Sequence, residues 1–267
     1  HTSNDIIIGG NTVSVQATAT RPMLHCHTGG TTTQPKRIAR DFETWALSFQ
    51  INRDRFAPNL GAIATLGHLS HSLTLYAACE AIVLGLRYVS GMGHNKVIDF
   101  FNEHGVDVLY ATPTQIRLLA LRERKNGLMD LRHVMIGGSK LDQTTRSLVQ
   151  RLAPNATIWQ FYGAAETSFI TISDDTCPPD SVGSPFDGVD IKLDNIDQVS
   201  GIGDIWVKSP YLFNGYSQGS SPDTYWDNGW LTIGEQGWLD GDGNLYIAGR
   251  KSRMITIADK NVFPEDI

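Results

Sequence analysis

The chain has 267 residues and a mass of 29.4 kDa; 41% of its residues are hydrophobic, 19% charged and 9% aromatic. This is the composition of an ordinary globular protein, and it excludes disorder as the main state. The length suits one large domain or two small ones. No apolar run approaches the roughly 20 residues of a membrane-spanning helix, and no charged-then-apolar leader opens the chain. We therefore expect no membrane span.

Charge and cysteine usage exclude further classes. The chain carries 22 Lys and Arg against 28 Asp and Glu, a net charge of −6, whereas nucleic-acid binding requires clustered positive charge. The three cysteines lie far apart without a CxxC pair, which predicts neither a disulfide framework nor a zinc site and favours a reducing, cytoplasmic location. The eight histidines are scattered and no HExxH occurs, so metalloprotease chemistry has no support.

Helix and strand patterns alternate through the middle of the chain. The predicted elements are, in chain order, an apolar helix over 73–86, a helix over 96–104, a strand over 106–111, a helix that begins at Thr112-Pro113, a strand over 133–136, a helix over 142–151 and a strand over 157–161. Short connections between such elements imply parallel strands in a layered α/β fold.

The pattern changes after about residue 178, where glycine and proline become frequent. Short β-rich runs over 189–192, 203–208 and 244–248 predict hairpins or a small barrel-like subdomain. The polar stretch 249–253 predicts a linker, and only 14 residues follow it.

The first segment with chemical character is the Gly/Thr-rich loop over 28–36. Small hydroxyl residues and glycines let the backbone approach a polyanion, and their N–H and O–H groups can donate to phosphate oxygens. Lys36 adds a positive charge at the end of the loop. The Walker pattern GxxxxGK[ST] is absent, and a plain surface loop is the alternative interpretation. The candidate phosphate-binding residues are Thr28, Gly29, Gly30, Thr31, Thr32 and Thr33.

The second segment is Tyr162-Gly163-Ala164-Ala165-Glu166, directly after the strand predicted over 157–161. The carboxyl ends of parallel strands are where α/β sheets hold ligands. Tyr162 offers a flat face for a base, and Glu166 offers a hard oxygen for Mg²⁺. The alternative is a helix start with an acid in its first turn.

Two further segments carry weaker signals. Glu235 and Arg250 flank a tight turn at 240–243 and could reach a ribose, although a plain hairpin with a charged rim is the alternative. The His and Ser residues of 68–72 suggest nucleophilic hydrolysis, but no GxSxG elbow accompanies them. His71 is therefore interpreted as a core or pocket-lining residue.

Taken in order, these segments resemble the AMP-forming adenylate synthetase superfamily, which includes acyl-CoA synthetases, firefly luciferase and peptide-synthetase adenylation domains. The similarity extends from about residue 25 to 267. It implies a large α/β domain of layered parallel sheets with flanking helices and a small β-rich subdomain over 1–248. Residues 249–267 would be the hinge and the first residues of a small C-terminal domain. It also implies that the chain is incomplete at both ends.

The resemblance assigns a role to each motif. It implies catalytic roles for Lys36, Glu166 and Arg250, with Glu166 as the Mg²⁺ ligand. The remaining implied roles are phosphate binding by 28–36, an acyl-pocket border at His71, adenine contacts from Gly137, Gly138, Ser139, Tyr162, Gly163, Ala164 and Ala165, ribose binding by Glu235, ribose and phosphate contact by Arg250, and the opening of the C-terminal domain at 261–264.

Several positions depart from the family's usual residues. They are Gly29 for Ser, Thr33 and Arg37 for Gly, Ala165 for Thr, Glu235 for Asp, Ser252 for Asp or Lys, and Asp259 for Gly. Ala165 lacks the hydroxyl that meets the nucleotide phosphate in the family, whereas Glu235 keeps the charge of the usual acid.

The activity implied is ATP-dependent activation of a carboxylic acid as acyl-adenylate, followed by transfer to a thiol, commonly coenzyme A. The implied ligands are ATP, Mg²⁺, coenzyme A and a small carboxylate. No acid near His71 could pair with an amino group, so an aliphatic or aryl acid is favoured over an amino acid. A catalytically impaired nucleotide- or acyl-binding relative and a domain that loads a carrier-protein thiol are the alternatives. The oligomeric state is not predicted.

Overall fold

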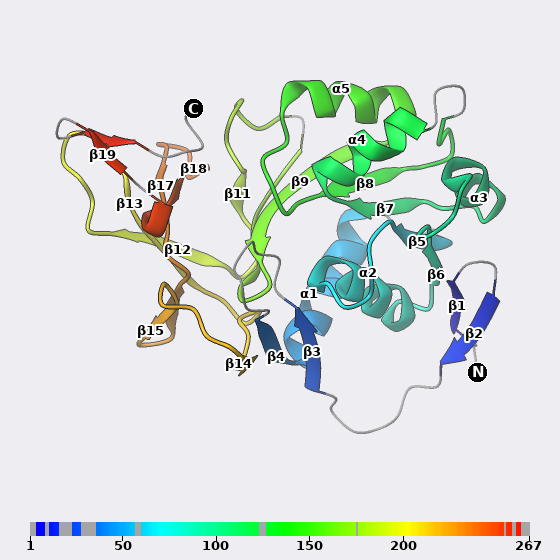
Figure 1. Ribbon diagram of the computed structural model, residues 1–267, viewed down its shortest axis with the longest axis horizontal. Coiled ribbons are helices and arrows are strands. Elements are labelled where there is room, and N and C mark those ends of the chain that lie inside the picture. Colours follow the sequence, from blue (N-terminus) through cyan, green and yellow to red (C-terminus); the bar gives the residue numbers. More distant parts are fainter. Residues whose placement is uncertain are drawn as a thin grey trace.

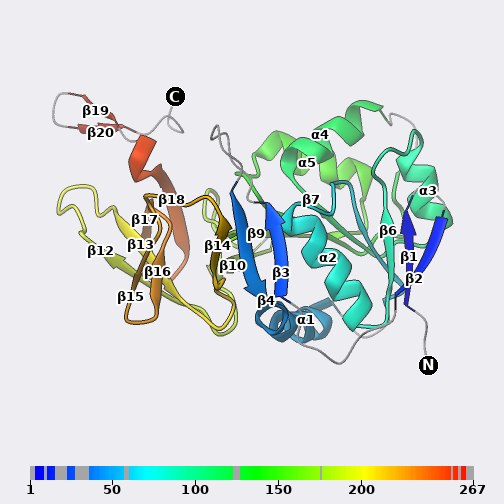
Figure 2. The same cartoon turned by 60° about the horizontal axis from the view of Figure 1, so that its bottom comes forward.

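The computed structural model describes residues 4–8, 11–15, 23–27, 36–56, 60–122, 127–174, 176–253, 255–257 and 260–262. Figures 1 and 2 show an α/β layered part beside a smaller β-rich part. This is the fold class expected from the sequence. Among the described residues, no helix is both long enough and apolar enough to cross a bilayer.

A nine-stranded sheet with the order β11-β10-β9-β8-β7-β5-β6-β1-β2 forms the centre of the larger part. Neighbouring strands from β1 through β6, β5, β7 and β8 to β9 are parallel, and β2, β10 and β11 are antiparallel additions at the two edges. The strands are β1 (Asn4–Ile8), β2 (Asn11–Val15), β5 (Ala62–Thr65), β6 (Arg87–Ser90), β7 (Val108–Ala111), β8 (His133–Ile136), β9 (Thr157–Ala164), β10 (Ser168–Ser173) and β11 (Ser184–Pro185).

Helices cover both faces of this sheet, as Figure 2 shows. They are α1 (Phe42–Phe56), α2 (Ser72–Val83), α3 (Val97–Glu103), α4 (Pro113–Arg122) and α5 (Gln143–Leu152). Ile63 and Val108 face the core shared with α1 and α2, whereas Ala64 and Leu109 face the core shared with α3, α4 and α5. Successive strand side chains point to opposite faces, so the central strands are mostly apolar and are buried on both sides.

Local sequence signals set several helix ends. The backbone N–H of Gln115 donates to Thr112 Oγ1 (3.3 Å), and the Thr112 N–H donates to Gln115 Oε1 (2.9 Å), which is a reciprocal capping box. The Asp142 carboxylate accepts from the backbone N–H of Thr145 (2.7 Å) at the start of α5. These contacts confirm the predicted starts of both helices.

The β-rich part contains a six-stranded sheet, which confirms the predicted change of pattern after residue 178. Its strands are β12 (Asp190–Asp194), β13 (Gly203–Lys208), β15 (Tyr225–Asp227), β16 (Trp230–Thr232), β17 (Glu235–Leu239) and β18 (Leu245–Arg250). Strand β18 includes Gly249 and Arg250, because both pair with β17. The first two residues of the predicted polar linker thus belong to a strand, and a short 3₁₀ turn at Lys251–Arg253 follows it.

Two small sheets complete the fold. Strands β3 (Met23–His27), β4 (Arg37–Asp41) and β14 (Gly215–Gln218) form an antiparallel sheet in the order β14-β4-β3. Strands β19 (Ile255–Ile257) and β20 (Lys260–Val262) form a hairpin. The three-stranded sheet lies where the two larger parts meet (Figure 1).

Candidate functional site

Strand β9 does not stop before the Tyr-Gly-Ala-Ala-Glu segment. It runs to Ala164, turns back within three residues and continues as antiparallel β10. The Ala164 N–H donates to Thr167 Oγ1 (2.9 Å), and the Thr167 N–H donates to the Ala164 carbonyl (3.2 Å), which closes the turn. The predicted end of the strand at 161 and the alternative of a helix start are both wrong, because this turn pairs two strands. Glu166 lies at its tip.

Gly163 is required by the close approach of these two strands. A Cβ placed on Gly163 would lie 1.9 Å from the Ser168 carbonyl oxygen. We expect Gly163→Ala to lower the free energy of unfolding by about 2 kcal/mol through forced separation of β9 and β10, as measured by urea unfolding. Gly241→Ala is the matched control, since a Cβ at Gly241 meets nothing within 4 Å. Equal effects of the two substitutions would contradict this account.

The Glu166 carboxylate is largely buried, with 9% of the residue exposed. Its Oε1 accepts a hydrogen bond from the Tyr216 hydroxyl (2.7 Å), and that hydroxyl also lies 3.0 Å from Thr224 Oγ1. The Glu166 carbonyl accepts from the backbone N–H of Phe213 (2.9 Å). Among the described residues, none donates a hydrogen bond to the second carboxylate oxygen, Oε2. The sequence predictions missed Tyr216, which lies 50 residues away.

Arg40 donates hydrogen bonds to the backbone of the same turn. It is fully buried on β4, and its Nη2 donates to the carbonyls of Ala165 (2.8 Å) and Glu166 (3.4 Å). Its Nη1 donates to the Tyr211 carbonyl and to Thr44 Oγ1. No carboxylate within the described ranges pairs with it, and burial lowers the pKa of Arg40 to about 10. Arg40 shares the buried face of β4 with Ile38, but no signal in the sequence marks it as buried.

Tyr162, Glu235 and Arg250 form the second half of the site. The Tyr162 hydroxyl donates to Glu235 Oε2, and Arg250 Nε donates to Glu235 Oε1 (3.2 Å). Glu235 and Arg250 are cross-strand partners on β17 and β18. Burial and the adjacent Glu235 carboxylate raise the pKa of Tyr162 well above its ordinary value, so its hydroxyl stays protonated and donates. The structure thus brings together three predicted site residues that are distant in sequence.

The Gly137-Gly138-Ser139 segment follows β8 and lies beside the Tyr162 segment, because β8 and β9 pair in parallel up to Ile136 and Gln160. A Cβ on Gly137 would lie 2.2 Å from Phe161 Cζ, so Gly137 leaves room for that ring. Gly138 has a φ of +86°, a conformation that favours glycine. The packing of Phe161 and the backbone conformation thus explain why glycine occupies positions 137 and 138. Ser139 is exposed.

His71 and Lys36 lie near the two ends of the predicted phosphate loop. The His27 N–H donates to the Ser70 carbonyl (2.8 Å), so the start of α2 at His71 adjoins the end of β3. Lys36 immediately precedes β4 and is partly buried. The other predicted loop residues lie outside the described residues; they are Thr28, Gly29, Gly30, Thr31, Thr32 and Thr33.

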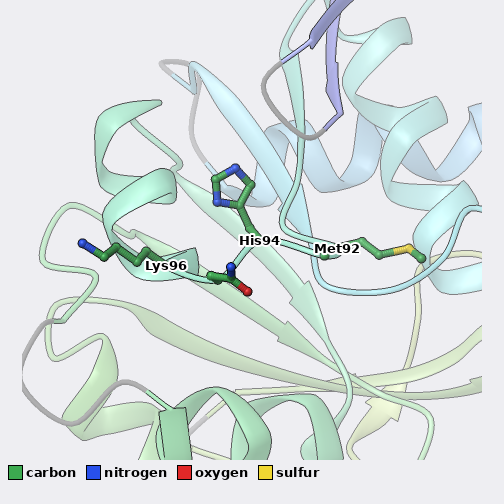
Figure 3. A pocket seen from close by; sticks show the side chains of 5 residues that line it. Met92, His94 and Lys96 are labelled. Carbon is green, nitrogen blue, oxygen red and sulfur yellow. The ribbon is translucent and has the colours of Figure 1, made fainter.

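A pocket that the sequence did not predict lies apart from these residues. It is lined by residues 92–96, between β6 and α3. The His94 ring stacks on Phe100 with 3.9 Å between ring centroids. Figure 3 shows the side chains of Met92, His94 and Lys96 pointing in different directions. The pocket therefore presents no convergent set of polar groups to a ligand.

The donor chemistry at Glu166 suits a cation that is shared with a phosphate. Within the described residues, no cluster of three or more His, Cys, Asp or Glu side chains could hold a metal ion. Mg²⁺ is commonly bound by one or two carboxylates together with substrate phosphates, rather than by an all-protein cage. With Oε1 engaged by Tyr216, the Oε2 atom of Glu166 fits that role.

The chain is similar to known proteins in sequence. The chain is 32% identical over 257 residues to the uncharacterized acyl-CoA ligase YhfT of Bacillus subtilis strain 168, covering 92% of this chain and 52% of that protein. It is 31% identical over 251 residues to the putative long chain fatty acid-CoA ligase VraA of Staphylococcus aureus strain COL, covering 92% and 53%. The chain spans about half the length of the curated relatives it matches.

The fold has solved counterparts as well. O-succinylbenzoate coenzyme A synthetase (MenE) from Bacillus subtilis, solved with ATP and magnesium ion, superposes with a TM-score of 0.78 at 25% identity over 91% of this chain and 53% of that chain. Residues 4–217 match the family described as AMP-binding enzyme. The chain therefore belongs to the AMP-binding enzyme family.

Proposed function

We propose that this chain is part of an ATP-dependent ligase that activates a carboxylic acid as acyl-adenylate and transfers it to coenzyme A. The observation that supports this most is the arrangement at the carboxyl end of β9. Tyr162 donates to Glu235, which is paired with Arg250. Four residues further along the chain, Glu166 accepts from Tyr216. The family membership and the names of the relatives YhfT and VraA agree with the proposal.

The proposed reaction joins two anions, so its main requirement is charge neutralisation. The acid's carboxylate oxygen attacks the α-phosphorus of ATP, the bond to the β-phosphate oxygen breaks, and pyrophosphate leaves with its electron pair. Arg250 and Lys36 supply positive charge to the phosphates, which lowers the barrier to this attack. Glu166 would hold Mg²⁺, which supplies further neutralisation of phosphate charge when bound. Glu235 would accept hydrogen bonds from the ribose hydroxyls, and Tyr162 would stack on the adenine.

The substrate class proposed is a carboxylic acid without an amino group to be paired. Ser70, His71 and Ser72 offer no carboxylate at the start of α2, and the named substrates of VraA and MenE are acids of this kind. We also propose that residues 1–248 belong to the large domain and that 249–267 lead into a further, small domain.

The test is nucleotide binding followed by turnover. Calorimetry with ATP, AMP and Mg²⁺ should detect binding, and pyrophosphate release should then appear with one member of a panel of aliphatic and aryl acids. No binding at millimolar ATP would overturn the proposal. Nucleotide binding by the full-length protein without pyrophosphate release from any acid would favour the impaired relative, for which Ala165 and Ser252 are the motivating residues. Thioester formation on a carrier protein but not on coenzyme A would favour the carrier-loading alternative.

The ribose role of Glu235 gives a separate prediction. We expect Glu235→Gln to weaken AMP binding about tenfold, because a charged acceptor of hydrogen bonds is replaced by a neutral one. AMP titration by calorimetry measures this change. Asp242→Asn is the control, since Asp242 is exposed in the turn between β17 and β18. Unchanged AMP affinity in Glu235→Gln would contradict the ribose assignment.

A further inference from the structure

The small sheet β14-β4-β3 connects two regions that the proposed reaction uses. Strand β3 ends at His27 and β4 begins at Arg37, so the 28–36 segment joins these two paired strands. Strand β14 pairs with the other edge of β4, with Tyr216 opposite Ile38. A residue anchored in this sheet is therefore tied to both ends of the predicted phosphate loop.

Two side chains of this sheet reach the Glu166 turn. From β4, Arg40 donates to the carbonyls of Ala165 and Glu166. From β14, Tyr216 donates to the Glu166 carboxylate at Oε1. The first contact fixes the backbone of the turn, and the second fixes the direction of the carboxylate. We call Arg40 and Tyr216 the Glu166 clamp.

Two features of the clamp suit it to fixing the position of Glu166. Arg40 is a fully buried cation whose partners are carbonyl and hydroxyl oxygens rather than a carboxylate. Its planar guanidinium reaches the Tyr211 carbonyl and the Ala165 carbonyl at once, which a lysine could not do with the same geometry. Tyr216 is itself held by Thr224, at 3.0 Å, so its hydroxyl hydrogen is directed to Glu166.

We propose that Arg40 and Tyr216 are positioning residues that orient Glu166 toward a divalent cation shared with the nucleotide phosphates, and that they tie this carboxylate to the strand that follows the phosphate loop. The proposal rests on the proposed function, because it assumes that Glu166 faces a cation bound to the nucleotide. Groups that hold a metal-binding carboxylate commonly change metal affinity tenfold or more when they are removed.

The experiment compares nucleotide binding with and without Mg²⁺. For the wild-type chain and Tyr216→Phe, calorimetry gives the Kd of ATP in EDTA, of ATP in excess Mg²⁺, and of AMP in EDTA. We expect Mg²⁺ to tighten ATP binding in the wild type and expect Tyr216→Phe to reduce that tightening about tenfold. Metal-free ATP and AMP should bind the variant as they bind the wild type, because the hydroxyl interacts with the side chains of Glu166, Thr224 and Ser221 and not with Tyr162, Glu235 or Arg250.

Tyr88→Phe is the matched control. It also removes a hydroxyl hydrogen bond, to Thr65 Oγ1 (2.7 Å) on the central sheet, and it should leave the Mg²⁺ effect unchanged. A purely structural role for Tyr216 would move all three Kd values together, or none of them, and either result would overturn the proposal. Binding of no nucleotide by the wild type would overturn the proposed function as well. Nucleotide binding without any Mg²⁺ effect in the wild type would overturn the clamp alone.

Arg40→Lys tests the other half of the clamp. The lysine keeps the charge but not the fork of donors, so we expect the Mg²⁺ effect to fall here too. Because both residues act on Glu166, the double variant should lose less than the product of the two single losses. Independent, fully multiplicative losses would contradict a shared target. If Arg40→Lys fails to fold, Tyr216→Phe decides the proposal.

Discussion

Glu166→Gln is expected to lower Mg²⁺-dependent pyrophosphate exchange about a hundredfold or more, because it removes the charge that would hold the cation at the transferring phosphate. The glutamine keeps the size of the side chain, and its amide oxygen can still accept from Tyr216. AMP binding in EDTA should therefore change little. Exchange assays over a range of Mg²⁺ concentrations, together with AMP calorimetry, measure the two effects on the same variant.

Glu235→Gln serves as the control for this prediction, because it is also a neutralised carboxylate beside Tyr162. The two variants should differ in kind: Glu235→Gln weakens AMP binding, whereas Glu166→Gln weakens the metal-dependent step. Equal losses of AMP binding and of exchange in Glu166→Gln would refute a metal role for this residue.

The second large effect concerns stability, and it arises at Glu80 on α2. This residue is fully buried. Its Oε2 accepts from the Tyr110 hydroxyl (2.6 Å), and its Oε1 accepts from Asn52 Nδ2 (2.8 Å). Tyr76 completes the cluster, with its hydroxyl 2.7 Å from Ser48 Oγ and 3.0 Å from Asn52 Nδ2. Helices α1 and α2 and strand β7 are thus joined by polar side chains inside an apolar core.

Burial raises the pKa of Glu80 from 4.5 to about 7, although the hydrogen bonds from Tyr110 and Asn52 lower it in part. The folded state therefore binds this proton more tightly than the unfolded state does. The resulting stability is fully present below the unfolded pKa and is lost as the pH rises through the folded pKa. The loss between about pH 5 and about pH 8 is on the order of 2–3 kcal/mol.

Glu80→Gln should remove this dependence, because the amide stays neutral throughout. Urea unfolding of both proteins at the two pH values gives the difference in the free energy of unfolding, and we expect that difference to shift in favour of the variant as the pH rises. Glu103→Gln is the control, since Glu103 is exposed at the end of α3. A wild-type-to-variant difference that stays constant with pH would show that Glu80 does not titrate in this range.

Local spacing determined much of the fold. The Thr112-Pro113 start of α4 and the Asp142 cap of α5 each depend on residues within one helical turn, so the sequence alone predicts them. The apolar runs of β7 and β8 likewise predicted buried parallel strands, because both faces of such a sheet are covered by helices. The order of motifs was sufficient to identify the family, even though each motif alone had a plain structural alternative.

The turn at Glu166 shows where local signals were insufficient. An acid after a small-residue segment is compatible with a helix start. Whether this segment forms a helix or a turn between strands depends on whether β10 returns to pair with β9. Gly163 permits that return, since the Ser168 carbonyl occupies the space of a side chain. The sequence by itself thus predicted the helices and strands between residues 96 and 161, the family, and the residues Tyr162, Glu166, Glu235 and Arg250 as candidates.

Only the tertiary structure decided which residues hold these side chains in place. Tyr162 and Glu235 are 73 residues apart, and Arg40 and Ala165 are 125 apart. Such pairs depend on the crossing of separate sheets, which no periodicity of 2 or 3.6 residues encodes. Arg40 in particular is an ordinary charged residue in the sequence. It becomes a buried anchor because folding places the carbonyls of Ala165 and Glu166 within reach of its Nη2, where they accept hydrogen bonds from the charged group.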